Sequence, residues 1–148
     1  MKKSVIAILL TIPLLAACSS LTLKPVSFGW SVENVLKADS QGNVEEQRHS
    51  ISFNVTPVFK AEFGDSTNAD SKEVRVIRNN EGYYFIAAKE FKNIYVFGSG
   101  NGSMVLENKI LVTEEGLQNP VFNQRNTYVE LIDGNSIYEL TSKGIIKR

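Results

Sequence analysis

The stretch from residue 128 to residue 140 has the sequence YVELIDGNSIYEL, and it decides the fold class. Two apolar-rich runs of strand length flank a central Asp133-Gly134 pair. Asp-Gly favours a type I′ turn, whose positive φ angles match the twist of paired strands. We therefore predict a β-hairpin with antiparallel strands over 128–132 and 137–140.

Similar patterns extend this prediction toward the N-terminus. Alternation of apolar and polar residues predicts strands over 26–32 and 51–63. The second of these should be bent or lie at an edge, because Pro57 cannot donate a backbone hydrogen bond. Residues 83–88 are apolar on both faces, which predicts a central strand. Shorter strands are expected near 74–76, 94–97, 104–106, 110–112 and 145–146, with turns at 39–43, 79–82 and 98–103.

Two segments fit this pattern less well. Residues 32–36 end the first strand with helical spacing of apolar residues, and residues 114–127 form a long connection of low periodicity. Counting the rest gives eight or nine short strands separated by turns. The expected fold is therefore all-β, a single antiparallel sandwich or small barrel.

The composition indicates one folded domain of near-neutral charge. The 148 residues include 16 basic and 16 acidic side chains, and 43% are hydrophobic. A neutral chain lacks the basic surface that displaces counterions from phosphates, so we do not expect a nucleic-acid partner. One histidine and one cysteine cannot build a Cys/His metal cluster within one chain, and we expect no metal and no cofactor.

The first seventeen residues have the order of a secretory signal. Basic Lys2 and Lys3 precede an apolar stretch over 5–15, and small Ala16 and Ala17 follow it. The apolar stretch has eleven residues, whereas a spanning helix needs about 20. We therefore predict a cleaved leader over 1–17 rather than a membrane span.

Leu15-Ala16-Ala17-Cys18 resembles the lipobox of bacterial lipoproteins, in which the cysteine thiol receives diacylglycerol. The resemblance implies lipidation at Cys18, a tether over 18–24 and an all-β domain over 25–148. Two or three acyl chains hold a protein at a membrane far more firmly than one. The alternative is an ordinary secreted protein with a chance cysteine near its cleavage site.

The residue after the lipobox cysteine bears on localisation. Ser19 differs from the aspartate that resembles an inner-membrane retention signal, so the resemblance implies an outer-membrane protein facing the periplasm. In a Gram-positive cell, the same lipobox would imply the outer face of the cytoplasmic membrane.

The aromatic residues of 83–97 are the strongest candidate for a binding surface. If 83–88 and 94–97 are neighbouring strands, Tyr84 with Ile86, and Tyr95 with Phe97, can share one face. Such a face could bind an apolar ligand, a glycan or a protein, although core packing is the simpler interpretation.

Other residues carry weaker signals. His49 could be a base at a pocket mouth, but a histidine satisfied at a strand end is the simpler interpretation. Asp65, Asn68 and Asp70 place oxygen atoms in one loop without an EF-hand pattern. Glycines 98, 100 and 102 lack the helix and lysine of a phosphate loop and predict a hairpin turn.

Three functions remain as hypotheses. The leading one is a non-catalytic envelope lipoprotein whose β domain binds a protein or an envelope polymer. The second is a carrier that holds an apolar molecule inside a barrel. The third is a hydrolase that uses two carboxylates across a cleft.

Overall fold

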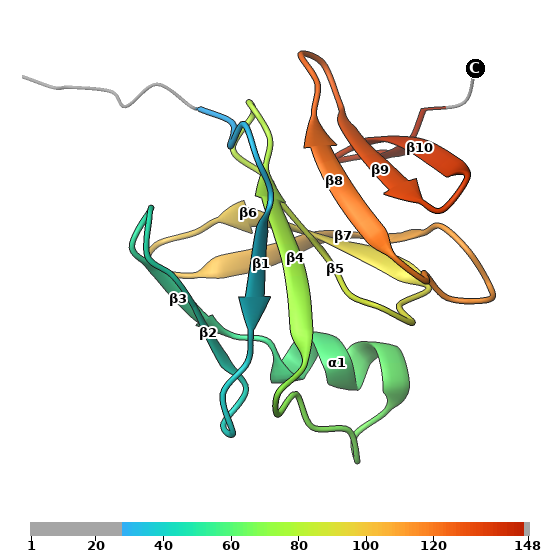
Figure 1. The fold of residues 1–148 in the computed structure, drawn as a ribbon. Coiled ribbons are helices and arrows are strands. Elements are labelled where there is room, and N and C mark those ends of the chain that lie inside the picture. Colours follow the sequence, from blue (N-terminus) through green and yellow to red (C-terminus); the bar gives the residue numbers. More distant parts are fainter. Residues whose placement is uncertain (1–27, 147–148) are drawn as a thin grey trace, which may run out of the picture.

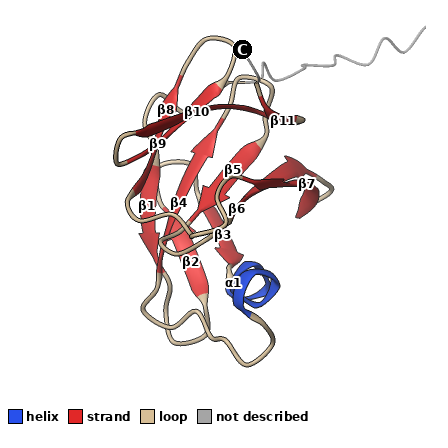
Figure 2. Ribbon diagram, turned by 90° about the vertical axis from the view of Figure 1, so that its right-hand side faces the viewer, coloured by secondary structure: helices blue, strands red, loops and turns tan. Residues whose placement is uncertain are grey.

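A computed structural model describes residues 28–146 and confirms the all-β class. Antiparallel strands are the main secondary structure of these residues, which also contain one short helix, α1 (Figures 1 and 2). The elements are β1 (Asn34–Lys37), β2 (Asn43–Glu46), β3 (Ile51–Asn54), α1 (Thr56–Phe63), β4 (Glu73–Arg78), β5 (Tyr84–Ala87), β6 (Asn93–Ser99), β7 (Met104–Leu111), β8 (Pro120–Gln124), β9 (Val129–Asp133), β10 (Ser136–Thr141) and β11 (Gly144–Ile145).

The strands form three sheets. Five strands pair in the order β1-β4-β5-β6-β7, four in the order β11-β10-β9-β8, and β2 pairs with β3 alone. One isolated bridge, between Val32 and Asn123, connects the five-stranded and four-stranded sheets. Within residues 28–146, no ladder pairs β7 with β11, so the two larger sheets form an open sandwich rather than a closed barrel.

The two larger sheets share a filled interior. Ile77, Phe85 and Val96 are cross-strand partners, so their side chains lie on one face of the five-stranded sheet. All three are fully buried. The residues that fill the interior from the four-stranded sheet are Phe122, Val129, Leu131 and Leu140.

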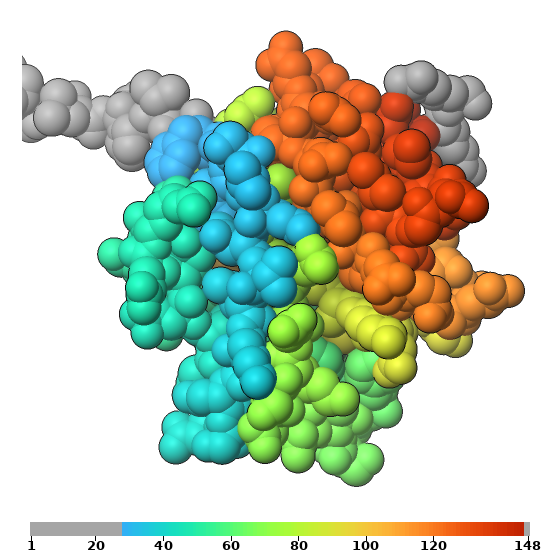
Figure 3. Space-filling model, in the orientation of Figure 1, coloured from blue at the N-terminus to red at the C-terminus, as the bar shows by residue number. Residues whose placement is uncertain are grey.

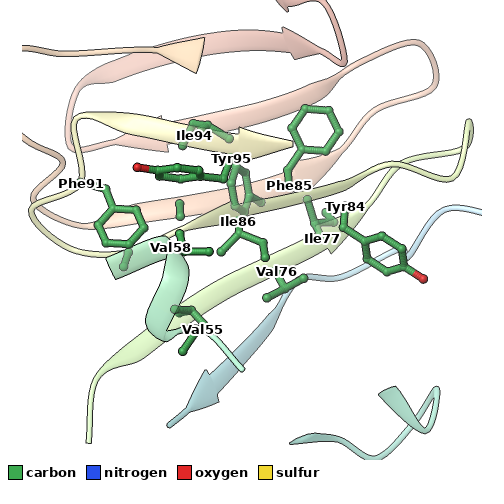
Figure 4. Packing of buried hydrophobic residues seen from close by; sticks show 14 of the residues in the cluster. Val55, Val58, Val76, Ile77, Tyr84, Phe85, Ile86, Phe91, Ile94 and Tyr95 are labelled. Atoms are coloured by element: carbon green, nitrogen blue, oxygen red, sulfur yellow. The ribbon is translucent and has the colours of Figure 1, made fainter. Parts of the chain in front are cut away.

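The opposite face of the five-stranded sheet is partly covered by α1 and the β2–β3 hairpin. Val76 and Ile86 are cross-strand partners on this face, and both are buried. Figure 4 shows Val58 of the helix close to Ile86 and Phe91, with Val55 at the start of the helix. In the space-filling view the β2–β3 hairpin lies on the left and β8–β10 at the upper right (Figure 3). Strand β5 is buried along all four residues because both of its faces are covered, which confirms the predicted central strand.

The predicted hairpins are present. Strands β9 and β10 pair around Gly134-Asn135, because Asp133 already pairs with Ser136. The type I′ turn predicted at Asp133-Gly134 was wrong: Gly134 has a φ of 58°, but Asn135 does not have the positive φ that type I′ also needs at its second central residue, and glycine at the first central position suits type II′. Strands β6 and β7 pair around the predicted glycine turn, where the Gly100 N–H donates to the Ser103 carbonyl at 2.7 Å.

The prediction of one strand over 51–63 was wrong after residue 54. Helix α1 begins at Thr56, and Pro57 lies in its first turn, where a missing N–H costs nothing. The Asn54 side chain accepts the Thr56 N–H at 2.9 Å and turns the chain out of β3. Val58 and Phe59 then provide the buried side of the helix.

The prediction of a strand over 26–32 was also wrong for its described part, residues 28–32. The Trp30 N–H donates to the Arg78 carbonyl, and β1 starts only at Asn34. The helical spacing of apolar residues over 32–36 does not produce a helix either, because β1 occupies most of that segment. Next to the start of β1, Glu33 pairs with Arg75 of β4 and accepts the Phe122 N–H at 2.8 Å. This carboxylate therefore contacts one strand of each of the two large sheets.

Residues 28–146 contain eleven strands rather than the expected eight or nine. No strand was predicted where β2 follows the expected turn over 39–43, and β8 lies within the predicted connection over 114–127. Residues 104–111 form one strand, β7, whose register against β6 shifts between Val96 and Phe97. The predicted break in this strand is therefore a β-bulge.

Candidate functional site

An open groove between the β2–β3 hairpin and the five-stranded sheet is the main candidate site. Its volume is about 710 Å³, within the range of small-molecule sites. We call it the groove; it is lined by residues of β3, α1, β5, β6 and the β6–β7 turn, namely Ser50, Ile51, Ser52, Phe53, Asn54, Pro57, Val58, Tyr84, Ile86, Phe97, Ser99, Gly100, Gly102, Ser103 and Met104.

The sheet register builds the floor of the groove. Tyr84 lies opposite Phe97, so their side chains are on the same face of the sheet. Ile86 is two residues beyond Tyr84 and therefore shares that face. Tyr84 and Ile86 are buried, and Phe97 is half-buried.

The wall of the groove comes from β3 and the start of α1. Ile51 and Phe53 alternate with polar Ser52 and Asn54, and both are half-buried. A tight approach holds this wall in place: the Gly42 carbonyl accepts the Val55 N–H at 2.8 Å, immediately before the helix.

The structure brings together three of the four residues that we predicted for a binding surface. Tyr84, Ile86 and Phe97 line the groove, whereas Tyr95 does not. Tyr95 is 1% exposed, and its ring packs edge-on against Phe91 with ring centroids 5.8 Å apart. The binding role of all four residues stays a prediction.

The Tyr95 hydroxyl has a specific structural partner on the helix. It donates to Glu62 Oε2 at 2.7 Å. Burial, followed by the Glu62 carboxylate, raises the pKa of Tyr95 well above its ordinary value of 10. Tyr95 is therefore neutral at physiological pH and helps to fix α1 to β6.

Electrostatically, the groove is neutral. Among the fifteen described residues that line it, there is no Asp, Glu, Lys, Arg or His. The Asn54 amide in its wall already donates to the Gln41 carbonyl and to Asn43. The arrangement selects for apolar groups, because a charged group placed there would lose hydration without gaining a counter-charge.

His49 lies next to the groove, adjacent to Ser50, and is tied to other residues. Its ring stacks on Trp30 with centroids 4.4 Å apart, and its Nδ1 lies 2.8 Å from Glu46 Oε2. Burial raises the pKa of the Glu46 carboxyl, but hydrogen bonds from the His49 and Arg48 N–H groups and from the His49 ring outweigh burial and bring the pKa below 4.5. These contacts describe a histidine that holds the β2–β3 turn against Trp30.

A second, more polar hollow of about 340 Å³ lies beside β4. Its lining includes Lys72, Arg75 and Lys89 together with Glu73 and Glu90. The two carboxylates are exposed and are interspersed with the three cations. Sequence patterns did not indicate this hollow, because its residues come from four separated segments without a motif.

The remaining candidates are placed as follows. Among the described residues, no three His, Cys, Asp or Glu side chains could hold a metal ion together. Asp65 and Asn68 are exposed, and Asp70 accepts the Ser71 hydroxyl at 3.1 Å. Cys18 and the whole predicted leader lie outside residues 28–146.

Twelve of the fifteen described residues that line the groove were not predicted for a binding surface. Ile51, Phe53 and Met104 reach it through the position of the β2–β3 hairpin and the β6–β7 turn. Among these residues, only those of β3 had a sequence pattern, the alternation of apolar and polar residues at 51–53. The wall was not predicted, because the helix that follows β3 was expected to be a continuation of the strand.

No family model, no curated protein and no solved structure matches the chain. Helix α1, in the described part of the chain, is too short and not apolar enough to cross a membrane.

Proposed function

We propose that this chain is a membrane-anchored envelope lipoprotein with a non-catalytic β domain, and that the groove binds an apolar, uncharged group. The signal order and the Leu-Ala-Ala-Cys lipobox support the anchor, with lipidation at Cys18 and an outer-membrane position facing the periplasm. The single observation that supports the binding role is the open groove with an apolar floor and no charged lining residue among those described.

The proposed ligand lies in the groove at the surface, not in the interior between the two large sheets. The carrier hypothesis placed the ligand inside a barrel, but Ile77, Phe85 and Val96 fill that space together with the four-stranded sheet. The groove lies on the other face of the five-stranded sheet and opens to solvent. An apolar molecule can reach it without unfolding the core.

We do not propose hydrolysis. The hydrolase hypothesis needs two carboxylates that face each other across a cleft. The described lining of the groove has none, and Glu73 and Glu90 of the second hollow lie among three cations.

Two measurements test the proposal. Metabolic labelling with palmitate should mark the wild-type protein and leave Cys18→Ala unmarked. Binding of the apolar fluorophore N-phenyl-1-naphthylamine by residues 19–148 should weaken at least fivefold in Phe97→Ala. The control is Phe63→Ala, because Phe63 is 44% exposed on α1 and lies outside the groove lining. Equal binding by both variants would refute the groove as the site.

A protein partner is the second candidate function, and strand β7 favours it. This eight-residue strand is the outer strand of its sheet, and Val105, Leu106 and Leu111 are each about half exposed. An outer strand offers backbone groups for strand addition by a partner. A photocrosslinker at residue 106 should capture one protein in cells, while one at exposed Glu114 should not; equal capture at both positions would count against β7.

A further inference from the structure

The lining of the groove combines apolar side chains with uncharged polar ones. Ile86 and Phe97 are apolar residues that the five-stranded sheet contributes beside Tyr84, and Ile51 and Phe53 are those that β3 contributes. The polar lining residues include Ser50, Ser52, Ser99 and Ser103. An occupant therefore meets hydroxyl groups as well as apolar side chains, but no charged group.

The groove lining contains no buried polar atom that needs a hydrogen bond from a ligand. In the described residues, three buried side-chain atoms lack a hydrogen-bond partner: Trp30 Nε1, Asn34 Nδ2 and Gln124 Oε1. None of these three residues belongs to the groove lining. A peptide placed along the floor would bury its own amide groups, and each unpaired amide disfavours binding. A hydrocarbon chain has no such groups.

The first described residue, Phe28, lies near the groove, so an anchor at Cys18 would hold the groove near a membrane. The described chain begins at Phe28, whose ring stacks on His49 with centroids 6.0 Å apart. Residues 18–27 number ten, and ten residues span at most about 36 Å when fully extended. A chain anchored at Cys18 therefore keeps Phe28 within that distance of the membrane surface, and the groove residue Ser50 directly follows His49, on which Phe28 stacks.

We propose that the groove binds one acyl chain of a phospholipid from the membrane to which this protein is tethered. The inference rests on the proposed function, because the tether supplies the nearby bilayer. The chain lies between Ile51 and Phe53 on one side and Phe97 on the other, with the headgroup outside the groove. The neutral lining places no requirement on the headgroup charge.

The test uses the mature protein purified from membranes and placed in phosphatidylcholine vesicles that carry a diazirine-labelled acyl chain. The intact mass is measured first and reports whether Cys18 is acylated. Photolysis and peptide mapping then locate the labelled residues. We expect labels in the peptides that contain β3 and the β6–β7 turn.

Matched variants make the test specific. Ile51→Gln and Met104→Gln place an amide in the groove, and labelling of the two groove peptides should fall at least tenfold. Ile137→Gln and Val35→Gln make comparable changes at residues 63% and 49% exposed that lie outside the groove lining, and labelling should be unchanged. A thermal melt confirms that each variant is folded, and agreement between the two groove variants guards against loss of fold in either one.

The outcomes separate the two proposals. Labelling spread over exposed apolar residues, or unchanged in Ile51→Gln and Met104→Gln, would overturn the acyl-chain inference whatever the mass of the protein. Specific labelling of groove peptides by a protein without acylated Cys18 would retain the inference and overturn the anchor. Crosslinking of the groove to a protein in preference to the lipid would also overturn the inference.

Discussion

Replacing Glu62 with alanine should loosen helix α1 from the five-stranded sheet. The Glu62 side chain is 2% exposed and accepts the Tyr95 hydroxyl at 2.7 Å and the Asn93 side-chain amide at 3.0 Å. It also accepts the Lys92 N–H, and the Lys109 ammonium group lies 4.0 Å away. One carboxylate thus connects the helix to β6, the segment before it and β7.

The size of the effect follows from the groups left without a partner. A buried donor that loses its acceptor costs about 1–3 kcal/mol, and here the Tyr95 hydroxyl and the donors of Lys92 and Asn93 are affected. Since water can reach the half-buried Asn93, we expect a total loss of about 3–5 kcal/mol, as found when one partner of a buried charged network is removed. Glu62→Gln keeps the shape and one acceptor oxygen and should cost about half as much.

Urea unfolding of residues 19–148, followed by the fluorescence of Trp30, the single tryptophan, measures this loss. The slope of free energy against urea should be unchanged. Glu114→Ala, at an exposed position, is the control. A double-mutant cycle with Tyr95→Phe should give a coupling of about 1–3 kcal/mol. A cost below about 1 kcal/mol for Glu62→Ala, or no coupling to Tyr95, would refute the reasoning.

Three further predictions concern the same fold. Gly42→Ala should destabilise more than Gly134→Ala by thermal melting, because both have positive φ but only at residue 42 would a Cβ meet a side-chain oxygen, at 2.0 Å; equal costs would contradict this. The pKa of Glu46 is lowered in the folded state, so its contribution to stability is present above pH 4.5 and is lost as the pH falls. In Glu46→Gln, the urea midpoint of unfolding should therefore decrease less on acidification than in the wild type. Since the folded pKa of Tyr95 is raised, stability should be lost as pH rises above 10, and Tyr95→Phe should remove that loss; a Tyr95 that ionises near pH 10 in an ultraviolet titration would disprove it.

Local patterns predicted the hairpins because their information is contained in neighbouring residues. Gly134, between two apolar-rich runs, supplies the positive φ that the turn needs, so the pairing of β9 with β10 was predictable although the turn lies one residue later than Asp133-Gly134 and differs in type. The all-apolar run of β5 likewise predicted burial on both faces. In these elements the residue pattern and the tertiary environment agree.

The transition from β3 to α1 shows where such reasoning fails. Ile51, Phe53, Val55 and Phe59 share one parity, so period two fits the sequence, but Val55, Val58 and Phe59 also fit a helix. The choice depends on Pro57 in a first helical turn and on Asn54, which accepts the Thr56 N–H. The groove was predictable only through its β5 and β6 residues for the same reason, since its wall depends on where this helix starts.

The groove itself follows from unequal element lengths. Strands β2 and β3 have four residues each, which span about 13 Å, whereas β6 and β7 have seven and eight residues and span about 23–26 Å. The hairpin and the eight-residue helix therefore cannot cover the whole face of the five-stranded sheet, and the part near Phe97 and Met104 stays open. Two more residues in each short strand would cover it and bury more apolar surface, which stabilises a fold by about 25 cal/mol per Å². Stability alone therefore does not explain an open groove with an apolar floor, and this is the physical reason to assign it a ligand.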